Sequence, residues 1–209
     1  MTGRRGQSPG GPWQGVAVTI SRMATATVER EIKLEWPSVA DARAAVVALG
    51  AAPVAPRRLQ DDVLLDTAEL ALRAERCALR VRRDGDVARL TFKGRPHADS
   101  MKVREELETG VGDADIVFTL LERLGFTPVF RYQKYREEFR IDGVTIAIDE
   151  TPVGVFVELE SPDGIAIDAL AARLGRGPAD YVTDSYYGLF AARRAERGLA
   201  GPHMVFASA

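Results

Sequence analysis

The sequence predicts an α+β protein whose antiparallel strands close into a barrel, with charged side chains inside and helices packed outside. The first observation is the run from Val28 to Glu35, where Glu29, Glu31 and Lys33 stand at every second position. Side chains two residues apart in a strand point to the same face. The second observation is that most later strands repeat this pattern, with acids on the first and last strands and bases between them.

The charge pattern has two interpretations. An open antiparallel sheet with one face in water has the same period. A closed barrel explains the choice of residues better, because Ser, Thr, Gln and Asn are almost missing from these positions and enclosed charges must be paired or bind ions. Two carboxylates beside an ammonium group suit a divalent cation next to an anionic oxygen. The pattern therefore implies a strongly anionic ligand accompanied by a divalent metal.

Composition excludes several other classes. The chain has 209 residues, a mass of 22.8 kDa and a net charge of -2, which argues against a nucleic-acid-binding surface. Cys77 is the only cysteine, so neither a disulfide framework nor a cysteine metal cluster is expected. No apolar run is long enough to cross a bilayer. We therefore expect a cytoplasmic protein with no membrane or nucleic-acid partner.

We expect three parts: a flexible leader at 1–26, one domain at 27–197 and a tail at 198–209 with no recognisable signal. The apolar stretch Val16–Ile20 is shorter than the roughly 7 to 15 residues of a secretory signal. The leader is therefore expected to be disordered, and Met23 is an alternative start.

The elements follow from turn and capping residues in chain order. Ser38 and Asp113 are good helix caps, Gly50 and Gly125 good stops, and Asp-Gly pairs mark hairpins. The expected strands are 28–35, 59–66, 78–83, 87–94, 101–109, 129–140, 144–150 and 155–161. The expected helices are 39–49, 113–124, 165–174 and 181–197, with a turn or short helix in 67–75 and a loop around Pro53 and Pro56.

Most of these strands place charged residues on one face. The shared faces carry Arg80 and Arg82; Arg89, Thr91 and Lys93; Lys102, Arg104, Glu106 and Glu108; Lys134, Arg136, Glu138 and Arg140; Thr145, Ala147 and Asp149; and Glu158 and Glu160. Apolar residues such as Leu79 and Val81 take the opposite faces, although Glu105 interrupts the alternation.

The ordered set of motifs resembles the CYTH domain, also called the triphosphate tunnel metalloenzyme superfamily. The matching segments are Glu29-x-Glu31-x-Lys33, Leu79-Arg80-Val81-Arg82, Leu90-Thr91-Phe92-Lys93-Gly94, Arg104-Glu105-Glu106-Leu107-Glu108, Lys134-Tyr135-Arg136, Ile148-Asp149, Phe156-Val157-Glu158-Leu159-Glu160 and Ser185-Tyr186. The resemblance covers about 28–194. It implies an eight-stranded antiparallel barrel forming a tunnel, which acts on triphosphates with Mg²⁺ or Mn²⁺. One position departs from many relatives, because Asp184 replaces a lysine that reaches the tunnel mouth.

Residue chemistry and the resemblance together give the expected roles. Carboxylates suit Mg²⁺ or Mn²⁺, and arginine and lysine suit phosphate oxygens. The expected metal ligands are Glu29, Glu31, Asp149, Glu158 and Glu160, although each could instead belong to an ion-pair network. The expected phosphate-binding residues are Lys33, Arg80, Arg82, Lys93, Lys134 and Arg136. Glu31, Lys33, Arg82 and Glu160 are the expected catalytic residues, and Arg104, Glu106 and Glu108 support them. His97 in a loop and His203 in the tail are expected to be surface residues, and Cys77 is expected to be a small buried apolar residue.

These roles favour a metal-dependent triphosphatase that acts on inorganic triphosphate, ATP or thiamine triphosphate. The main alternative is a class IV adenylate cyclase that converts ATP to cyclic AMP and pyrophosphate, since the same charges serve both reactions. A non-catalytic polyphosphate-binding module and, more distantly, a lipocalin-like carrier are the alternatives outside enzymes. A carrier of apolar ligands would need an apolar lumen.

Overall fold

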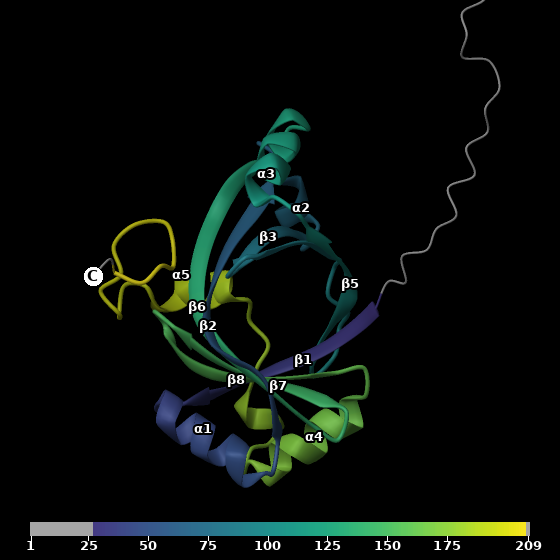
Figure 1. Cartoon of the computed structure of the whole chain (residues 1–209), viewed down its shortest axis with the longest axis vertical. Coiled ribbons are helices and arrows are strands. Elements are labelled where there is room, and N and C mark those ends of the chain that lie inside the picture. The colour runs from purple at the N-terminus through teal and green to yellow at the C-terminus, as the bar shows by residue number, and fades with distance from the viewer. Residues whose placement is uncertain (1–26, 208–209) are drawn as a thin grey trace, which may run out of the picture.

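The computed structural model describes residues 27–207, and within them the predicted barrel is confirmed. Nine strands form one sheet in the order β5-β4-β3-β2-β6-β7-β8-β1-β9, and an additional pairing of β5 with β1 closes it. All neighbouring strands are antiparallel. Figure 1 shows the strands as a ring seen through the opening of the barrel, with the helices outside the ring.

The strands have the following bounds: β1 (Thr27–Trp36), β2 (Ala52–Asp66), β3 (Ala78–Asp84), β4 (Val87–Lys93), β5 (Lys102–Val111), β6 (Thr127–Ile141), β7 (Val144–Thr151), β8 (Gly154–Ser161) and β9 (Tyr181–Val182). The helices are α1 (Val39–Ala48), α2 (Ala71–Ala74), α3 (Ala114–Arg123), α4 (Gly164–Arg173) and α5 (Tyr186–Arg193), with a 3₁₀ turn at Pro178–Asp180. No helix in residues 27–207 is long and apolar enough to span a membrane.

The main core lies between the barrel wall and the helix pair α1 and α4 (Figure 1). Ile32 and Leu34 on β1 are fully buried here, on the face opposite the charged residues of the same strand. Ile167 from α4 packs into the same cluster. Burying one such side chain contributes roughly 1.5–3 kcal/mol. The alternation along β1 therefore puts its apolar face against the helices and its charges in the lumen.

The predicted helix caps are confirmed by side-chain hydrogen bonds. The Ser38 hydroxyl accepts from the backbone N–H of Asp41, and the Asp113 carboxylate accepts from two backbone N–H groups at the start of α3. Each cap satisfies donors that have no partner inside the helix.

Two predicted boundaries are wrong. Strand β2 begins at Ala52 and runs through the expected proline loop, with register shifts on both sides of Ala55. Proline fits such irregular positions because its missing N–H breaks no ladder hydrogen bond there. The last helix, expected over 181–197, covers only Tyr186–Arg193. It begins after the Ser185 cap, because Tyr181 and Val182 pair with β1 as the short strand β9.

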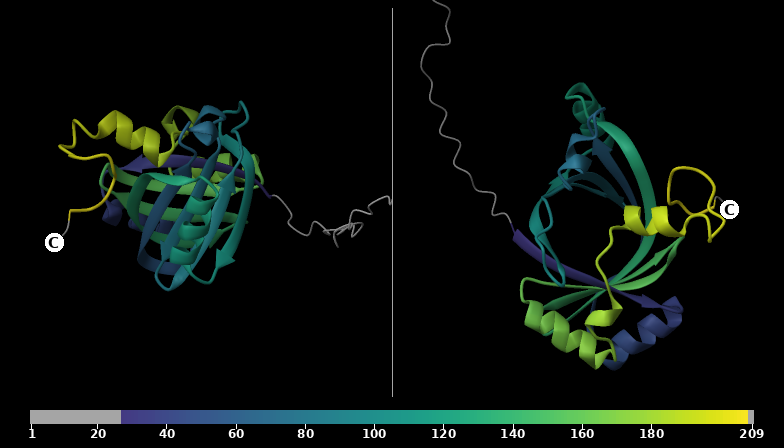
Figure 2. Two further views of the ribbon diagram at one scale, coloured as in Figure 1. Left: turned by 90° about the horizontal axis from the view of Figure 1, so that it is seen from above. Right: turned by 180° about the vertical axis from the view of Figure 1, so that it is seen from behind.

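The C-terminal tail also has structure, which its sequence did not indicate. Met204 is fully buried, and it exchanges backbone hydrogen bonds with Arg131 and Gln133 of β6. Figure 2 shows this segment, in yellow, beside the barrel wall. The expected leader at 1–26 lies outside the described residues.

Candidate functional site

The barrel encloses a cavity of about 1420 Å³. Its walls carry charged side chains from seven of the strands. The sequence-predicted residues among them are Glu29, Glu31, Lys33, Arg80, Arg82, Lys93, Arg104, Glu106, Glu108, Lys134, Arg136, Glu158 and Glu160. Of the predicted set only Asp149 does not line the cavity; it is fully buried beneath Arg136, Lys134 and Tyr186.

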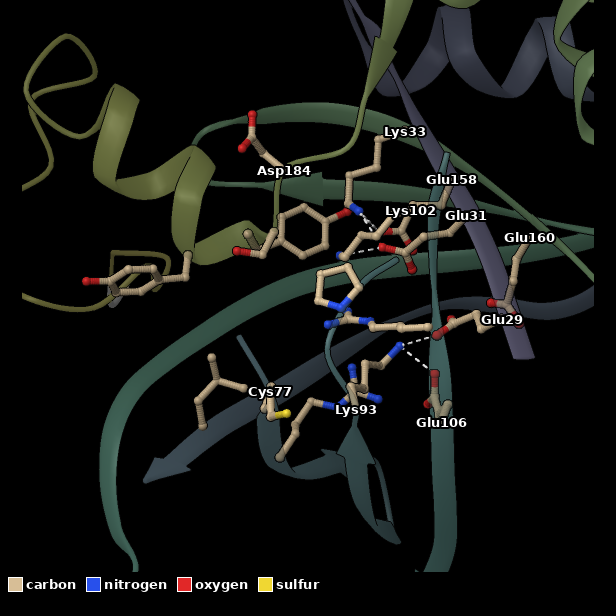
Figure 3. A pocket seen from close by; sticks show the side chains of 18 of the residues that line it. Glu29, Glu31, Lys33, Cys77, Lys93, Lys102, Glu106, Glu158, Glu160 and Asp184 are labelled. Carbon is tan, nitrogen blue, oxygen red and sulfur yellow. Dashed lines mark hydrogen bonds and ion pairs between the residues drawn. The ribbon is translucent and has the colours of Figure 1, made fainter. Parts of the chain in front are cut away.

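The first acidic group forms where β1 pairs with β8. In this register Glu31 lies opposite Glu160, and Lys33 opposite Glu158. The Lys33 ammonium lies 3.0 Å from Glu31 and 3.3 Å from Glu158, and the Lys102 ammonium lies 2.6 Å from Glu31 (Figure 3). Burial would raise the carboxyl pKa values, but the neighbouring cations hold the pKa of Glu31 and Glu158 well below the usual range. Both carboxylates are therefore ionised.

The second acidic group joins β1 to β4 and β5. The Lys93 ammonium lies 2.7 Å from Glu29 and 2.6 Å from Glu106 (Figure 3). Burial and the hydrogen bond with Glu106 raise the pKa of Glu29 to about 8. Desolvation between the walls, with a contribution from Glu31, also raises the pKa of Glu160. For both carboxyls, burial outweighs the attraction of Lys93, which by itself would lower the pKa.

The basic wall is formed by β3 and β6. Arg82 Nε donates to Asp62 at 2.8 Å, and Arg80 lies 3.4 Å from the same carboxylate. On β6, Lys134 lies 2.8 Å from Asp149, and Arg136 pairs with both Asp149 and Glu158. Buried acids on the same inward face thus hold these basic side chains in place.

Asp149 has both carboxylate oxygens occupied. Arg136 donates to each of them, Lys134 donates to Oδ2, and the Tyr186 hydroxyl donates to Oδ2 at 2.6 Å. Of the two roles considered for Asp149, this geometry is that of the ion-pair network. Its side chain orients Lys134 and Arg136 toward the cavity.

Sequence reasoning missed several residues at the site. Asp62 was not singled out because Gln60, Asp61 and Asp62 are three consecutive polar residues and give no alternation. Lys102 lies on the predicted face but received no role, although it is a direct partner of Glu31. Cys77, expected to be buried, is half-buried and lines the cavity, as does the exposed His97.

Several buried polar atoms have no hydrogen-bond partner among residues 27–207. They are Arg80 Nε, Arg104 Nε, Asp62 Oδ2 and Gln60 Oε1, together with Trp36 Nε1. The first four belong to the cavity wall or to residues that support it. Buried groups of this kind usually find a ligand or an ordered water. Glu108 contacts Arg89 and Thr91, and 29% of its side chain is exposed.

The donor set fits a hard divalent cation. Glu29, Glu31, Glu158 and Glu160 supply carboxylate oxygens from two paired strands, which is the chemistry that Mg²⁺ and Mn²⁺ prefer. Within residues 27–207 no three acidic, His or Cys side chains already form a coordination shell, and lysines pair with these carboxylates instead.

Several known proteins are similar to this chain. A Methanocaldococcus jannaschii protein named "Putative adenylate cyclase" is 30% identical over 106 residues, which is 50% of this chain and 60% of the relative's length. A solved Pyrococcus horikoshii protein superimposes with a TM-score of 0.68 at 26% identity, over 79% of this chain and 99% of that one.

A Hippeastrum protein, described as "Putative adenylyl cyclase" with a dominant triphosphatase activity, superimposes with a TM-score of 0.62 at 22% identity, over 78% of this chain and 95% of that one. The family model of the CYTH domain matches residues 27–186. The chain therefore belongs to the CYTH domain family.

Proposed function

We propose that this chain is a divalent-metal-dependent triphosphatase whose catalytic domain spans 27–197. The observation that carries the proposal is the enclosed cavity in which carboxylates of β1 and β8 lie beside arginines and lysines of β3, β4 and β6. A triphosphate carries several negative charges. Transfer of its terminal phosphoryl group to water therefore depends mainly on positioning and charge neutralisation. This cavity supplies both kinds of group.

The phosphate chain would lie on the basic residues. Arg80 and Arg82 offer planar donors and Lys33, Lys93, Lys134 and Arg136 offer further positive charge, with Arg104 added because its Nε lacks a partner. Asp62 would hold Arg82 in position and Asp149 would hold Arg136. Lys33 and Arg82 would stabilise charge that develops on the transferred phosphoryl oxygens.

The acidic residues would hold the metal. Glu29, Glu31, Glu158 and Glu160 are the proposed ligands, and Asp149 is assigned to orientation of the basic wall instead. When bound, Mg²⁺ or Mn²⁺ would neutralise phosphate charge in the cavity. Lys93 and Lys102 would then exchange carboxylate partners for phosphate oxygens, since their present partners Glu29 and Glu31 would be shared with the cation.

A second candidate is an adenylate cyclase. The name of the M. jannaschii relative favours it, although this chain spans only 60% of that protein's length. The Hippeastrum protein is similar to this chain in fold alone. Its name is that of a cyclase, and a dominant triphosphatase activity is described for it. Assays must therefore score both reactions.

One assay panel tests the proposal. Inorganic triphosphate, ATP and thiamine triphosphate are each incubated with Mg²⁺ or Mn²⁺, and phosphate, pyrophosphate and cyclic AMP are measured. We expect phosphate release that EDTA abolishes and that Glu160→Gln nearly abolishes, with the fold retained by circular dichroism. Cyclic AMP with pyrophosphate as the main products would establish the cyclase, and metal-dependent binding without turnover would establish the non-catalytic module. Full activity in EDTA would reject the metal assignment.

A further inference from the structure

Helix α3 has apolar residues on two sides. The inward side packs on the outer face of β2, β3 and β4 and consists of Ala114, Val117, Phe118 and Leu121. On the other side Ile116, Leu120 and Leu124 leave 59%, 58% and 72% of their surface exposed. Residues four apart in a helix lie above one another on one face. These three side chains therefore form one continuous exposed row, the α3 stripe.

The α3 stripe differs from the rest of the helical surface. Helices α1 and α4 each expose one large apolar side chain, Val47 and Ile165, whereas α3 and its last turn expose three in a row. Figure 1 shows α3 at the end of the molecule opposite α1 and α4, on the outside of the barrel. A surface helix usually has polar residues on the side that faces away from its own core. A contiguous apolar row there marks a contact with another molecule.

A row with opposite charges at its two ends runs beside the α3 stripe. Asp115, Thr119 and Arg123 each precede one member of the stripe and are themselves four residues apart, so they lie alongside it. All three are exposed. Asp115 pairs with Arg83 of its own chain, but its side chain stays open to solvent. The row is therefore acidic where α3 begins and basic where α3 ends.

A two-fold axis through the middle of the row makes it complementary to itself. Two copies of α3 related by this axis run antiparallel, and residues 115 and 123 of opposite copies lie at the same level. Asp115 of each copy then faces Arg123 of the other, so the favourable pair occurs twice. Opposite helix ends also lie together, which suits their dipoles. A parallel arrangement would instead place Asp115 beside Asp115.

We propose that the α3 stripe binds the α3 stripe of a second copy of this chain, with the two helices antiparallel, and forms a homodimer. From Ile116 to Leu124 the stripe extends over about 12 Å of helix, so it supplies only part of the roughly 1,000 Å² that a specific interface buries. The dimer is therefore weak and reversible, with a dissociation constant on the order of micromolar. Neither the stripe nor the charged row lines the cavity, so this inference is independent of the proposed function.

Sedimentation equilibrium of the full chain tests the apolar contact. From about 1 to 500 µM, a range that brackets a micromolar dissociation constant, the wild type should change from monomer to dimer. Leu120→Glu should raise the dissociation constant about a hundred-fold or more, because it brings two carboxylates into the apolar contact. Val47→Glu is the matched control at a position of α1 that is 50% exposed, and it should leave the dissociation constant unchanged. Circular dichroism checks that each variant is folded.

Mixing two charge variants tests the antiparallel arrangement. Asp115→Lys brings two cations together and Arg123→Glu brings two carboxylates together, so each variant alone should dimerise about five-fold more weakly than wild type or less tightly still. A mixture of the two variants restores opposite charges at both contacts and should dimerise within about three-fold of wild type. Both positions are exposed, so these variants test the dimer even if Leu120→Glu unfolds.

Four results would overturn the proposal. The wild type could stay monomeric at every concentration, or its dimer could be insensitive to Leu120→Glu. The two charge variants could associate no better together than apart, which would reject the antiparallel pair. Association that continues beyond the dimer would show that the contact does not close on a two-fold axis.

Discussion

Two neighbouring aspartates on β2 experience opposite environments. Asp62 is fully buried against Arg82, whereas Asp61 points to the outer surface and pairs with the exposed Arg131. Asp62→Asn leaves two arginines without their carboxylate, so we expect a loss of about 3–5 kcal/mol in the free energy of unfolding. Asp61→Asn should cost roughly 1 kcal/mol or less, because a solvent-exposed partner is screened. Urea unfolding at pH 7 measures both, and equal losses would contradict the assignment of Asp62 to the interior.

The ion pairs of Asp62 with Arg82 and Arg80 predict that stability depends on pH. Burial would raise the pKa of Asp62, but Arg82 and Arg80 lower it below the ordinary value of 3.8. A lowered folded pKa gives stability that is present above the unfolded pKa and is lost as pH falls through the folded pKa. The difference between wild type and Asp62→Asn should therefore be full at pH 7 and shrink below pH 3.8. A difference that stays constant down to pH 2 would contradict this prediction.

Substitution of Arg82 tests whether the basic wall binds phosphate. Arg82→Ala removes at least one charge-assisted contact with phosphate, so we expect kcat/KM to fall about ten-fold to over a hundred-fold, equivalent to roughly 1.5–3 kcal/mol. Lys93→Ala should act similarly. Mn²⁺ binding to the free protein should persist in both variants, since neither side chain can coordinate a cation. Wild-type kcat/KM on every triphosphate would mean that Arg82 serves the fold alone.

At the scale of elements, the tail after α5 packs against strand β6. Met204 is fully buried in the cluster of Phe130, Tyr132, Tyr186 and Phe190. Met204→Ala leaves a cavity there, and we expect a loss of about 2–5 kcal/mol in the free energy of unfolding. Denaturant unfolding measures it. Ile165→Ala, at a helix position that is 80% exposed, is the control and should change stability by less than about 0.5 kcal/mol.

At the scale of the whole molecule, ligand binding should stabilise the closed barrel. The proposed ligand contacts come from both sides of the β1–β5 seam, where residues 27–31 pair with 102–106. Inorganic triphosphate with Mn²⁺ at about a hundred times its dissociation constant should raise the melting temperature by roughly 5–11 °C. EDTA should cancel the shift. A shift of the same size in EDTA would show that the phosphate binds without a cation.

Local pattern was sufficient for much of the fold. The alternation of Glu29, Glu31 and Lys33 with core residues determined which face of β1 is charged, since successive side chains of a strand point to opposite faces. The Asp142-Gly143 hairpin was predictable because both residues adopt positive φ, which Asp and Gly tolerate best. The placement of the charged faces inside a barrel followed from the cost of enclosing unpaired charge.

The tertiary structure decided which charges meet. Glu31 and Lys102 are 71 residues apart and touch only because β1 pairs with β5 across the seam of the barrel. Asp62 belongs to no alternating charge pattern in the sequence. Asp149 follows the pattern expected of a metal ligand, but Arg136, Lys134 and Tyr186 enclose it. Tyr187 of α5 meets Phe130 of β6 only because α5 packs against the barrel. A sequence pattern fixes the face on which a side chain lies, whereas its partner depends on strand register and on elements that pack from far along the chain.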